Sequence, residues 1–497
     1  MLRSSFVAEV WSTFGVDLHL DLGAPSGRRA AIERALREAI RSGRLAPGAR
    51  LPSTRALAVE LGTSRGTVTA AYDQLTAEGY LMARHGSGTV VAGLTKVPSQ
   101  PSSAQAPATA PRYDLRPGTP DVTTFPVAAW LRSARRALSS APTSAFGYGD
   151  PAGQMPLRSA LAEYLGRARG VLARPEQIVI TTGFVQALAL LTQILRRNGA
   201  IAMEDPGLPL HRSVVRHSGG RVVPLPVDGD GARTELLPPL DVAACVLTPA
   251  HQYPLGMTLH PQRRHGAAEW ARERGGFVIE DDYDGEFRYD RQPVGAMQGI
   301  APDHVVYVGT ASKTLGPALR LAWVVLPERL VEPFIRAKRH TDLHSDIVSQ
   351  LTFTDLITTH SYDRHIRANR LRYRRRRDAM VLRLATVPHV TVEGVAAGLH
   401  AVVRLAAAHQ VDTVLAAAAA RDLVMDEVGR HWHDPHCGEP GLIVGYGTPP
   451  DGRYPAALDV LVRTLRGVSR QDLAGHGPSQ QSDLVLRCER RARHEEG

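Results

Sequence analysis

The N-terminal part of the chain carries apolar residues at the spacing of three short helices. Ile32, Leu36 and Ile40 recur every four residues, which predicts an amphipathic helix. Ser53 and Ser64 are of a type that favours helix N-caps, and apolar residues at helical spacing follow each of them. Because only a short turn separates the second helix from the third, the pattern predicts a helix-turn-helix.

After the third helix, apolar and polar residues alternate around a glycine-rich turn. The stretch YLMARHGSGTVV, residues 80–91, therefore predicts a β-hairpin that carries Arg84 and His85. Helices and hairpin together form a winged helix-turn-helix, whose third helix would present Arg65 and Thr67 to phosphates and base edges of DNA. The alternative is an ordinary helical bundle with a solvated basic face. The residues expected to contact DNA are Arg50, Ser53, Arg55, Ser64, Arg65, Thr67, Arg84 and His85.

A change in composition divides the chain. Residues 93–112 are rich in Pro, Ser, Ala and Gln and predict a flexible linker between an N-terminal domain, residues 15–92, and a large domain, residues 113–472. In the large domain the β-branched runs IVIT, ACVLT, FVIED and VVYVG alternate with helical stretches, which is typical of buried parallel strands in an α/β fold. Functional groups are then expected beyond the carboxyl ends of these strands. The polar tail, residues 473–497, is expected to be disordered.

Lysine is rare in this chain, and one lysine follows a predicted strand. The sequence has three lysines, Lys96, Lys313 and Lys338, among 59 Lys and Arg residues. A lysine amine can lose its proton and attack an aldehyde to form a Schiff base, whereas an arginine stays protonated near neutral pH. That reaction anchors pyridoxal phosphate, so Lys313 is a candidate for binding this cofactor. For an isolated Ser-Lys pair, an exposed surface lysine would be the simpler interpretation.

Polar residues suited to the rest of this cofactor follow the predicted strands. Gly183 opens a helix whose free amides near Phe184 and Val185 could bind a phosphate. Asp281 could pair with a pyridine nitrogen and Tyr283 with the ring oxygen, although a merely solvated acidic turn would contain the same residues. The hydroxyls and the guanidinium expected to complete a phosphate site are Thr310, Ser312 and Arg320.

Two resemblances bring these patterns together. The run from Gly48 to Val91 resembles the DNA-binding domain of GntR-family regulators over its full length. Residues 112–470, with motifs such as EDPG and TPAHQYPLG, resemble fold-type I aminotransferases. The combination of a GntR-like DNA-binding domain and an aminotransferase-like domain in one chain resembles the MocR/GabR-type transcriptional regulators. This resemblance implies a head-to-tail homodimer in which Tyr148 reaches the phosphate across the interface, and it places Tyr253 where aminotransferases have an asparagine facing the cofactor.

Two positions depart from the pattern of these families. Ile443, in GLIVGYG, stands where aminotransferases and GABA-responsive regulators have an arginine that binds the substrate carboxylate. Losing two charge-assisted bonds of roughly 1.5–3 kcal/mol each would weaken amino-acid binding by about two to four orders of magnitude. Efficient transamination is therefore not expected. Leu208 replaces a tyrosine that relatives commonly place against the cofactor ring.

We therefore expect a transcriptional regulator, not an enzyme, in which pyridoxal phosphate is itself the signal, as in the regulators of vitamin B6 synthesis that this chain resembles. Three alternatives stay open: a regulator that responds to an amine or amino acid joined to the cofactor, an active aminotransferase with a DNA-binding head, and a DNA-binding protein whose large domain binds no cofactor. The expected partners are pyridoxal phosphate, a double-stranded DNA operator and a second copy of the chain.

Charge and cysteine content fit such a protein. A formal net charge of +10 suits a polyanionic partner. The 3 cysteines have no CxxC spacing, and no segment has the pattern of a signal peptide or a membrane span, so a cytoplasmic protein is expected. The cluster HWHDPHC, residues 431–437, matches no common metal-site spacing. The run RYRRRR, residues 372–377, is expected to form a solvated helix face, with a contact to DNA as the alternative.

Overall fold

The computed structural model describes residues 27–84, 88–93, 111–289, 294–405, 409–434 and 438–472. Its contacts divide the chain into two units, residues 1–108 and residues 109–497. His85, most of the predicted linker and the predicted tail lie outside the described residues. No helix in the described parts of the chain is long and apolar enough to cross a membrane.

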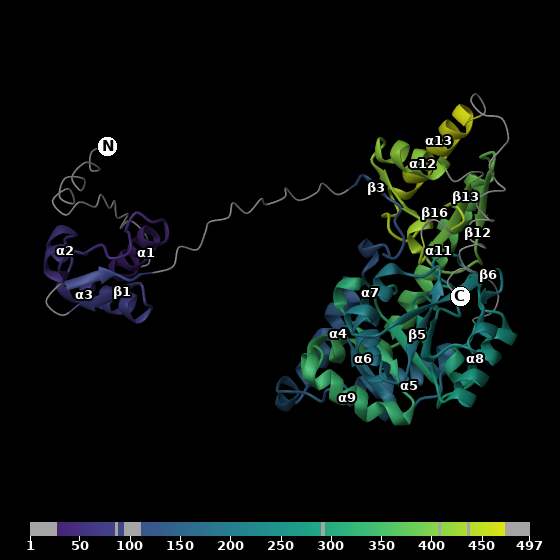
Figure 1. The fold of residues 1–497 in the computed structure, drawn as a ribbon, viewed down its shortest axis with the longest axis horizontal. Coiled ribbons are helices and arrows are strands. Elements are labelled where there is room, and N and C mark those ends of the chain that lie inside the picture. Colours follow the sequence, from purple (N-terminus) through teal and green to yellow (C-terminus); the bar gives the residue numbers. More distant parts are fainter. Residues whose placement is uncertain are drawn as a thin grey trace, which may run out of the picture. The chain divides into compact units, whose positions relative to one another are not determined.

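The N-terminal unit has the three helices and the hairpin that the apolar pattern predicts (Figure 1). Both predicted N-caps are confirmed: Ser53 Oγ accepts the amide of Ala56 at 3.2 Å, and Ser64 Oγ accepts the amide of Thr67 at 3.1 Å. The elements are α1 (Arg28–Arg41), α2 (Thr54–Glu60), α3 (Arg65–Ala77), β1 (Leu81–Arg84) and β2 (Gly88–Val91). Their shared core includes Ile32, Leu36, Leu57, Val68, Tyr72, Leu75 and Val91.

An eight-stranded sheet forms the centre of the large unit, in the order β4 (Ile178–Thr181), β11 (Ala322–Val325), β10 (Val305–Thr310), β9 (Phe277–Asp282), β8 (Val242–Leu247), β5 (Ala200–Asp205), β6 (Val222–Asp228) and β7 (Gly231–Ala232). The strands from β10 to β6 pair in parallel, as the β-branched runs predict. At the β4 end lies β11, which is not among the four predicted runs; it runs antiparallel to both β10 and β4, so β4 keeps the direction of the parallel strands. Residues 311–321 connect β10 to β11, and a parallel crossover needs a longer connection of about a dozen residues or more, usually with a helix.

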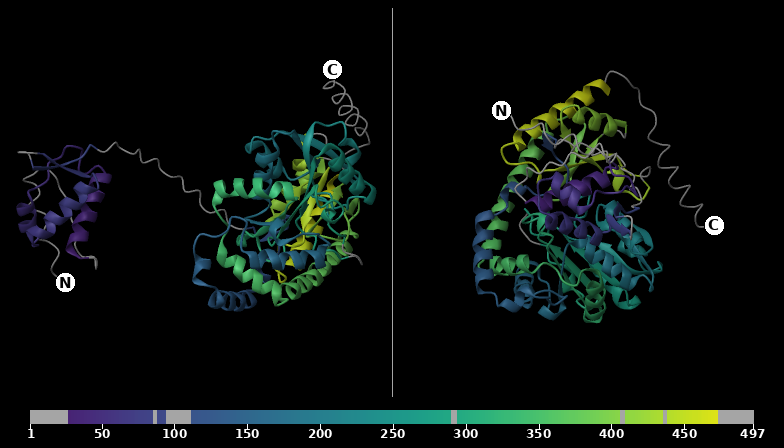
Figure 2. Two further views of the ribbon diagram at one scale, coloured as in Figure 1. Left: turned by 90° about the horizontal axis from the view of Figure 1, so that it is seen from below. Right: turned by 90° about the vertical axis from the view of Figure 1, so that its left-hand side faces the viewer.

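Helices cover both faces of this sheet, which gives the predicted α/β class (Figure 2). Val306 and Val308 of β10 pack in a core with residues of α6 and α9, whereas Tyr307 packs in a second core with residues of α5 and α10. Successive side chains of a strand point to opposite faces, so each strand supplies both cores. The helices of this region are α4 (Val127–Ser140), α5 (Met155–Arg169), α6 (Phe184–Leu195), α7 (Pro209–His217), α8 (Pro261–Arg274), α9 (Glu328–Asp342), α10 (Ile347–Thr358) and α11 (Ser361–Leu384).

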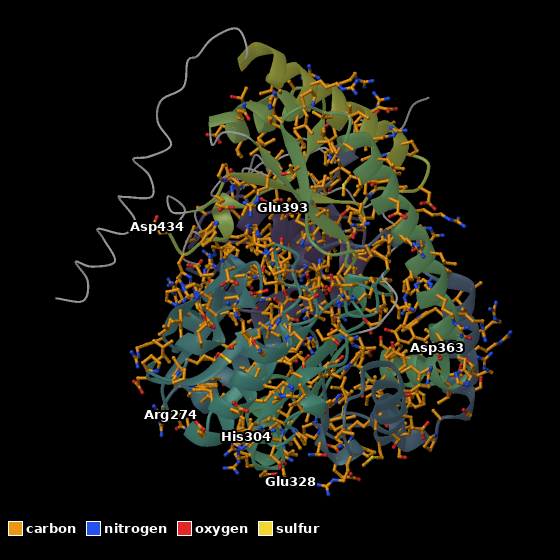
Figure 3. The ribbon with its side chains drawn as sticks, turned by 90° about the vertical axis from the view of Figure 1, so that its right-hand side faces the viewer. Arg274, His304, Glu328, Asp363, Glu393 and Asp434 are labelled. Carbon is orange, nitrogen blue, oxygen red and sulfur yellow. The ribbon has the colours of Figure 1, made fainter. Side chains whose placement is uncertain are left out.

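A smaller antiparallel sheet lies at the other end of the large unit, beside helices α12 (His409–Ala419) and α13 (Tyr454–Asp472) (Figure 1). In Figure 3, Glu393 marks this sheet, and Arg274, His304 and Glu328 lie at the opposite end. The strand order is β12 (Val390–Glu393), β13 (His400–Leu405), β16 (Gly441–Gly445) and β15 (Asp426–Glu427). The first strand of the large unit, β3 (Tyr113–Asp114), pairs in parallel with β14 (Leu423–Val424).

One arginine of the run RYRRRR is buried, which corrects the prediction of a solvated helix face. Arg376 on α11 is only 4% exposed, and its guanidinium lies 2.7 Å from Asp121 Oδ2 and 2.5 Å from Asp451 Oδ1. It also donates to two backbone carbonyls at 3.1 and 3.2 Å. Arg374 and Arg375 are exposed, as predicted. The helical period turns one arginine of the run inward, toward partners that the local sequence does not contain.

Candidate cofactor site and DNA-binding surface

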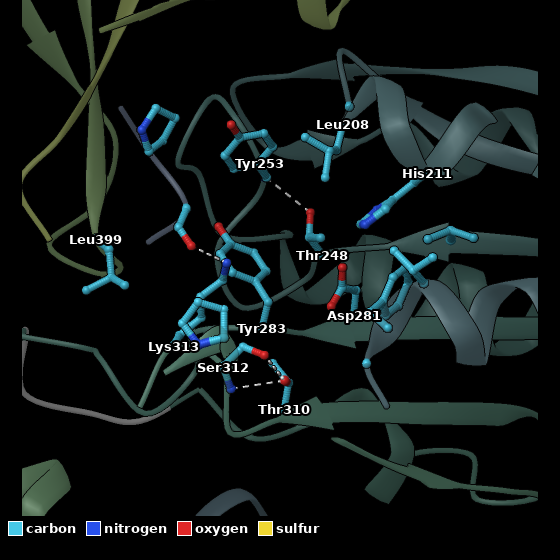
Figure 4. Close-up of a pocket in the computed structure, with 18 of the residues that line it drawn as sticks. Leu208, His211, Thr248, Tyr253, Asp281, Tyr283, Thr310, Ser312, Lys313 and Leu399 are labelled. Atoms are coloured by element: carbon cyan, nitrogen blue, oxygen red, sulfur yellow. Dashed lines mark hydrogen bonds between the residues drawn. The ribbon is translucent and has the colours of Figure 1, made fainter. Parts of the chain in front are cut away.

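A cavity of about 450 Å³ lies at the carboxyl ends of β9 and β10 (Figure 4). Segments far apart in the sequence form its walls: residues 116–118, the N-terminus of α6, the start of α7, and His400 and Asp426 of the smaller sheet. Tyr148 is the one predicted cofactor residue that does not line it. The predicted residues that do are Tyr253, Asp281, Tyr283, Gly183, Phe184, Val185, Thr310, Ser312, Lys313 and Arg320.

Lys313 reaches the cavity from the turn that follows β10. Its side chain is partly buried, and its Nζ donates a hydrogen bond to the carbonyl of Gly118. Burial lowers the pKa of the Lys313 amine, and the carboxylates of Asp281 and Asp284 partly oppose this shift. A lower pKa increases the fraction of neutral amine, which is the form that attacks an aldehyde.

Asp281 and Tyr283 come from the end of β9 and face the same space as Lys313 (Figure 4). Burial raises the pKa of Asp281 well above its usual range, and the nearby Lys313 partly opposes the shift. A buried carboxyl of this kind becomes charged when a cationic group, such as a protonated pyridine nitrogen, lies beside it. Burial and the charge of Asp284 also raise the pKa of Tyr283, so this phenol keeps its proton.

The predicted phosphate site lies between α6 and the turn after β10. Gly183 is the N-cap of α6 and has a φ of 149°. A Cβ atom at this position would lie 2.9 Å from the Arg320 guanidinium. The glycine therefore leaves room for Arg320 beside the free amides at the start of the helix. Thr310 Oγ1 donates to Ser312 Oγ at 2.9 Å and accepts the Ser312 amide at 3.1 Å. These donors suit a phosphate. Together with an amine for the aldehyde and a carboxyl for the ring nitrogen, the residues present fit pyridoxal phosphate.

His211 and His400 also line the cavity, although neither is singled out in the sequence. His211 packs its ring 4.6 Å from the ring of Phe184, and burial together with Lys313 lowers its pKa to about 3. A neutral imidazole at this wall could flank the cofactor ring, which Leu208 cannot do by aromatic stacking. The signal available in the sequence is the position of His211 at the start of the helix that follows EDPG.

Ile443 does not line the cavity. It is buried in β16, where it packs with Leu255, Val402 and Val428. The residue opposite Ile443 in the register of β15 and β16 is Asp426, and Asp426 does line the cavity. An acidic group therefore stands at the wall near the position where aminotransferases have an arginine.

Three arginines line the cavity, and two of them already have partners. Arg116 binds the carboxylate of Asp114 through two bonds of 2.6 and 3.0 Å. Arg212 is buried and donates to the backbone carbonyls of residues 207, 431 and 432 at 2.7–3.1 Å. Arg320 lies at the predicted phosphate site. Among the described residues of the cavity, a ligand carboxylate would thus find a guanidinium only by displacing a partner of Arg116 or Arg212, or by taking the place of the phosphate at Arg320.

Tyr148 lies on the surface, where 91% of it is exposed. Its nearest aromatic neighbour is His344, with ring centroids 6.2 Å apart. A large aromatic side chain so exposed in one chain is suited to a contact with a second chain. The predicted role of Tyr148 at the phosphate of a dimer partner stays a prediction.

Basic side chains gather on the N-terminal unit around α3 and the hairpin. Arg50, Arg55, Arg65 and Arg84 are all exposed. Arg65 is the first residue of α3, so it stands where the helix amides are free to meet a phosphate. Ser64 and Thr67 join their hydroxyls at 2.8 Å, which fixes both side chains at the start of α3, as Ser53 is fixed at the start of α2 by its capping bond.

Comparisons with known proteins cover both units. Residues 28–91 match the family of bacterial regulatory proteins called gntR, and residues 114–441 match the aminotransferase class I and II family. The chain is 32% identical to the probable rhizopine catabolism regulatory protein MocR of Rhizobium meliloti, over 86% of this chain and 92% of that protein. This chain belongs to the MocR-type transcriptional regulators. The resemblance seen in the sequence is thereby confirmed.

Other relatives of this MocR-type regulator include the pyridoxine biosynthesis transcriptional regulator PdxR of Corynebacterium glutamicum, which is 30% identical over 85% of this chain and 93% of that protein. The uncharacterized regulator YdeL of Bacillus subtilis is 35% identical over 74% of this chain and 81% of that protein. Among solved structures, the kynurenine aminotransferase of Pyrococcus horikoshii shares the fold of the large domain, with a TM-score of 0.66 at 24% identity over 72% of this chain and 92% of that chain. The aminotransferase class I and II family, to which this domain belongs, depends on pyridoxal phosphate.

Proposed function

We propose that this MocR-type regulator binds pyridoxal phosphate at Lys313 and that pyridoxal phosphate is the signal that controls its binding to DNA. The composition of the cavity supports this most directly. The cavity is lined by a suitable partner for each polar group of the cofactor, whereas Ile443, which replaces the carboxylate-binding arginine, is buried away from the cavity. A site that suits the cofactor but not an amino-acid substrate is suited to sensing the cofactor. We also propose that transamination is inefficient.

Each residue has a distinct part in this proposal. When bound, pyridoxal phosphate supplies an aldehyde that joins to a lysine amine. Lys313 provides the amine, Asp281 holds the ring nitrogen and Tyr283 bonds the ring oxygen. The amides at the start of α6 bind the phosphate together with Thr310, Ser312 and Arg320. His211 and Tyr253 flank the space around the ring and exclude water from it.

The hydrogen bond from Lys313 to Gly118 suggests how the cofactor affects the DNA-binding domain. Gly118 lies shortly after the predicted linker, residues 93–112. The Thr448 hydroxyl shares its one hydrogen between the carbonyls of Arg116 and Thr119, at 2.8 and 3.0 Å, and so holds the backbone on either side of Gly118. If the Lys313 amine held the cofactor, it would have fewer hydrogens to donate to Gly118, and the restraint on the segment that leads to the linker would change. By thermodynamic reciprocity, operator DNA must change cofactor affinity by the same factor.

The N-terminal domain, for which we propose the boundaries 15–92, reads a double-stranded operator through α3 and the hairpin. We propose that the large domain, residues 113–472, forms a homodimer, so that two winged helices meet two half-sites. The name of the PdxR relative supports genes of vitamin B6 synthesis as targets. Because its partner is DNA and no described helix could span a membrane, we propose that the regulator acts in the cytoplasm.

An amine effector that joins the cofactor is a second candidate, and the position of Asp426 at the cavity wall favours it. A carboxylate there would attract a second ammonium group and repel a carboxylate. Putrescine and 4-aminobutyrate have similar length but opposite charge at one end, so they form a matched pair of probes for this candidate.

The test couples visible absorbance to operator binding at a fixed salt concentration, because salt sets DNA affinity. We expect a cofactor absorbance band in the wild type that Lys313→Ala abolishes, together with a change in operator affinity when pyridoxal phosphate is added. Lys338→Arg is the matched control, since it replaces another lysine and can keep the ion pair with Asp342. A cofactor band without a change in operator affinity would refute the role of pyridoxal phosphate as the signal. A change in operator affinity that appears only when putrescine is added would favour an amine effector. Absence of the band would refute cofactor binding itself.

A further inference from the structure

A buried histidine and aspartate lie directly behind Tyr283. His251 and Asp284 are each 2% exposed, and His251 Nδ1 lies 2.9 Å from Asp284 Oδ2. His251 follows β8 and Asp284 follows β9, so the parallel sheet brings together residues that are 33 positions apart. The other ring nitrogen, Nε2, is buried and has no hydrogen-bond partner among the described residues. None of the cofactor contacts proposed above uses this pair.

The pair contacts the cofactor site through the phenol of Tyr283. Tyr283 Oη lies 3.1 Å from His251 Nδ1 and donates to the His251 carbonyl at 3.1 Å. Since the Asp284 carboxylate can only accept, the hydrogen on Nδ1 points toward Asp284. Asp284 thus fixes the orientation of the imidazole, and the Nδ1–H is shared with the Tyr283 oxygen, which accepts from it at 3.1 Å. The N–H and the carbonyl of His251 together fix the place of that oxygen.

The surrounding backbone leaves room for this pair and for little else. Gly398 has a φ of +71°, and a Cβ atom there would lie 2.2 Å from His251 Cε1 and 2.6 Å from Asp284 Oδ2. The ring of His400 stands 5.0 Å from the ring of His251. Apolar side chains of similar size would avoid the desolvation cost of burying a carboxylate. A buried polar pair at this position therefore indicates a functional role.

We propose that His251, oriented by Asp284, is a positioning residue for Tyr283, and that it thereby sets the proton affinity of the Lys313 nitrogen when the cofactor is joined to it. The inference rests on the proposed binding of pyridoxal phosphate at Lys313. A phenol placed against the ring oxygen changes how a proton is shared between that oxygen and the neighbouring lysine nitrogen. The other titratable groups that face Tyr283 are Asp281, Asp284, Tyr253, His400 and Lys313.

The experiment is a pH titration of the visible absorbance of the full-length, cofactor-loaded protein. We expect His251→Leu to move the titration midpoint by about one pH unit, a tenfold change in proton affinity, in the same direction as Tyr283→Phe. In the His251→Leu/Tyr283→Phe double variant we expect no further shift, because the two residues act through one contact. His251→Asn should restore most of the wild-type midpoint, since its amide nitrogen can take the place of Nδ1.

His217→Leu, at an exposed histidine of α7, is the matched control and should leave the midpoint unchanged. Circular dichroism checks that each variant is folded. If His251→Leu does not fold, His251→Phe replaces it, because it keeps a planar ring of similar size and removes the nitrogen that contacts Tyr283. Unchanged midpoints in a folded variant, or shifts that add in the double variant, would overturn the inference alone. A wild type without a cofactor band would overturn the proposed function and this inference together.

Discussion

Replacing Arg376 with methionine is expected to destabilise the large domain by about 3–5 kcal/mol, the usual cost of removing one partner of a buried ion pair. Arg376 holds two carboxylates, but their surroundings differ. The side chain of Asp121 is 1% exposed, whereas that of Asp451 is 59% exposed. Asp451 can return to water and contributes little. Nearly all of the cost therefore comes from leaving the Asp121 carboxylate buried without its cation.

Urea unfolding followed by tryptophan fluorescence measures this change, because four of the five tryptophans belong to the large unit. These are Trp130, Trp270, Trp323 and Trp432. Arg374→Met is the matched control from the same helix: the ion pair of Arg374 with Asp378 spans 3.9 Å on the surface, so its loss should cost no more than about 0.5 kcal/mol.

Adding Asp121→Asn to Arg376→Met should recover part of the loss, since it removes the uncompensated charge. A loss in Arg376→Met no larger than that of the control would refute this account of the buried pair. Asp121 follows closely on Gly118, which accepts the Lys313 hydrogen bond, so we also expect Arg376→Met to weaken pyridoxal phosphate binding.

Three further predictions concern the two domains. Ser64→Ala, which removes the N-cap of α3, should lower the free energy of unfolding of the N-terminal domain by about 1 kcal/mol in a thermal or urea melt. Arg65→Ala should weaken operator binding by about 1–3 kcal/mol in a fluorescence anisotropy titration if Arg65 reads a base; a loss that is equal for specific and random DNA would instead assign it to the phosphate backbone. Burial raises the pKa of Glu204 from 4.5 to about 7, so the folded domain holds a proton that the unfolded chain releases. The free energy of unfolding of the large domain should therefore fall by up to about 3 kcal/mol as the pH rises from 4.5 to 7. Glu204→Gln should remove this part of the pH dependence when unfolding is measured across that range.

The sequence by itself predicts the helices of the N-terminal domain and four strands of the large sheet, β4, β8, β9 and β10. Capping bonds such as that of Ser64 join residues three positions apart, and the apolar period of α1 depends only on its own residues. Lys313 could be singled out in the same way, because the chain has so few lysines and this one follows a β-branched run. These features depend on neighbours in the chain, so a local pattern is enough to find them.

Only the tertiary structure decides which distant residues meet. The contacts of Lys313 with Gly118, of Arg376 with Asp121 and of His251 with Asp284 join residues 195, 255 and 33 positions apart. The antiparallel direction of β11, the inward turn of Arg376 and the burial of Ile443 away from the cavity depend likewise on how the sheets and helices pack. The partners that packing supplies decide whether a side chain is buried or exposed and whether a group is charged or neutral. The local sequence contains only one member of each such pair, so it cannot show these outcomes.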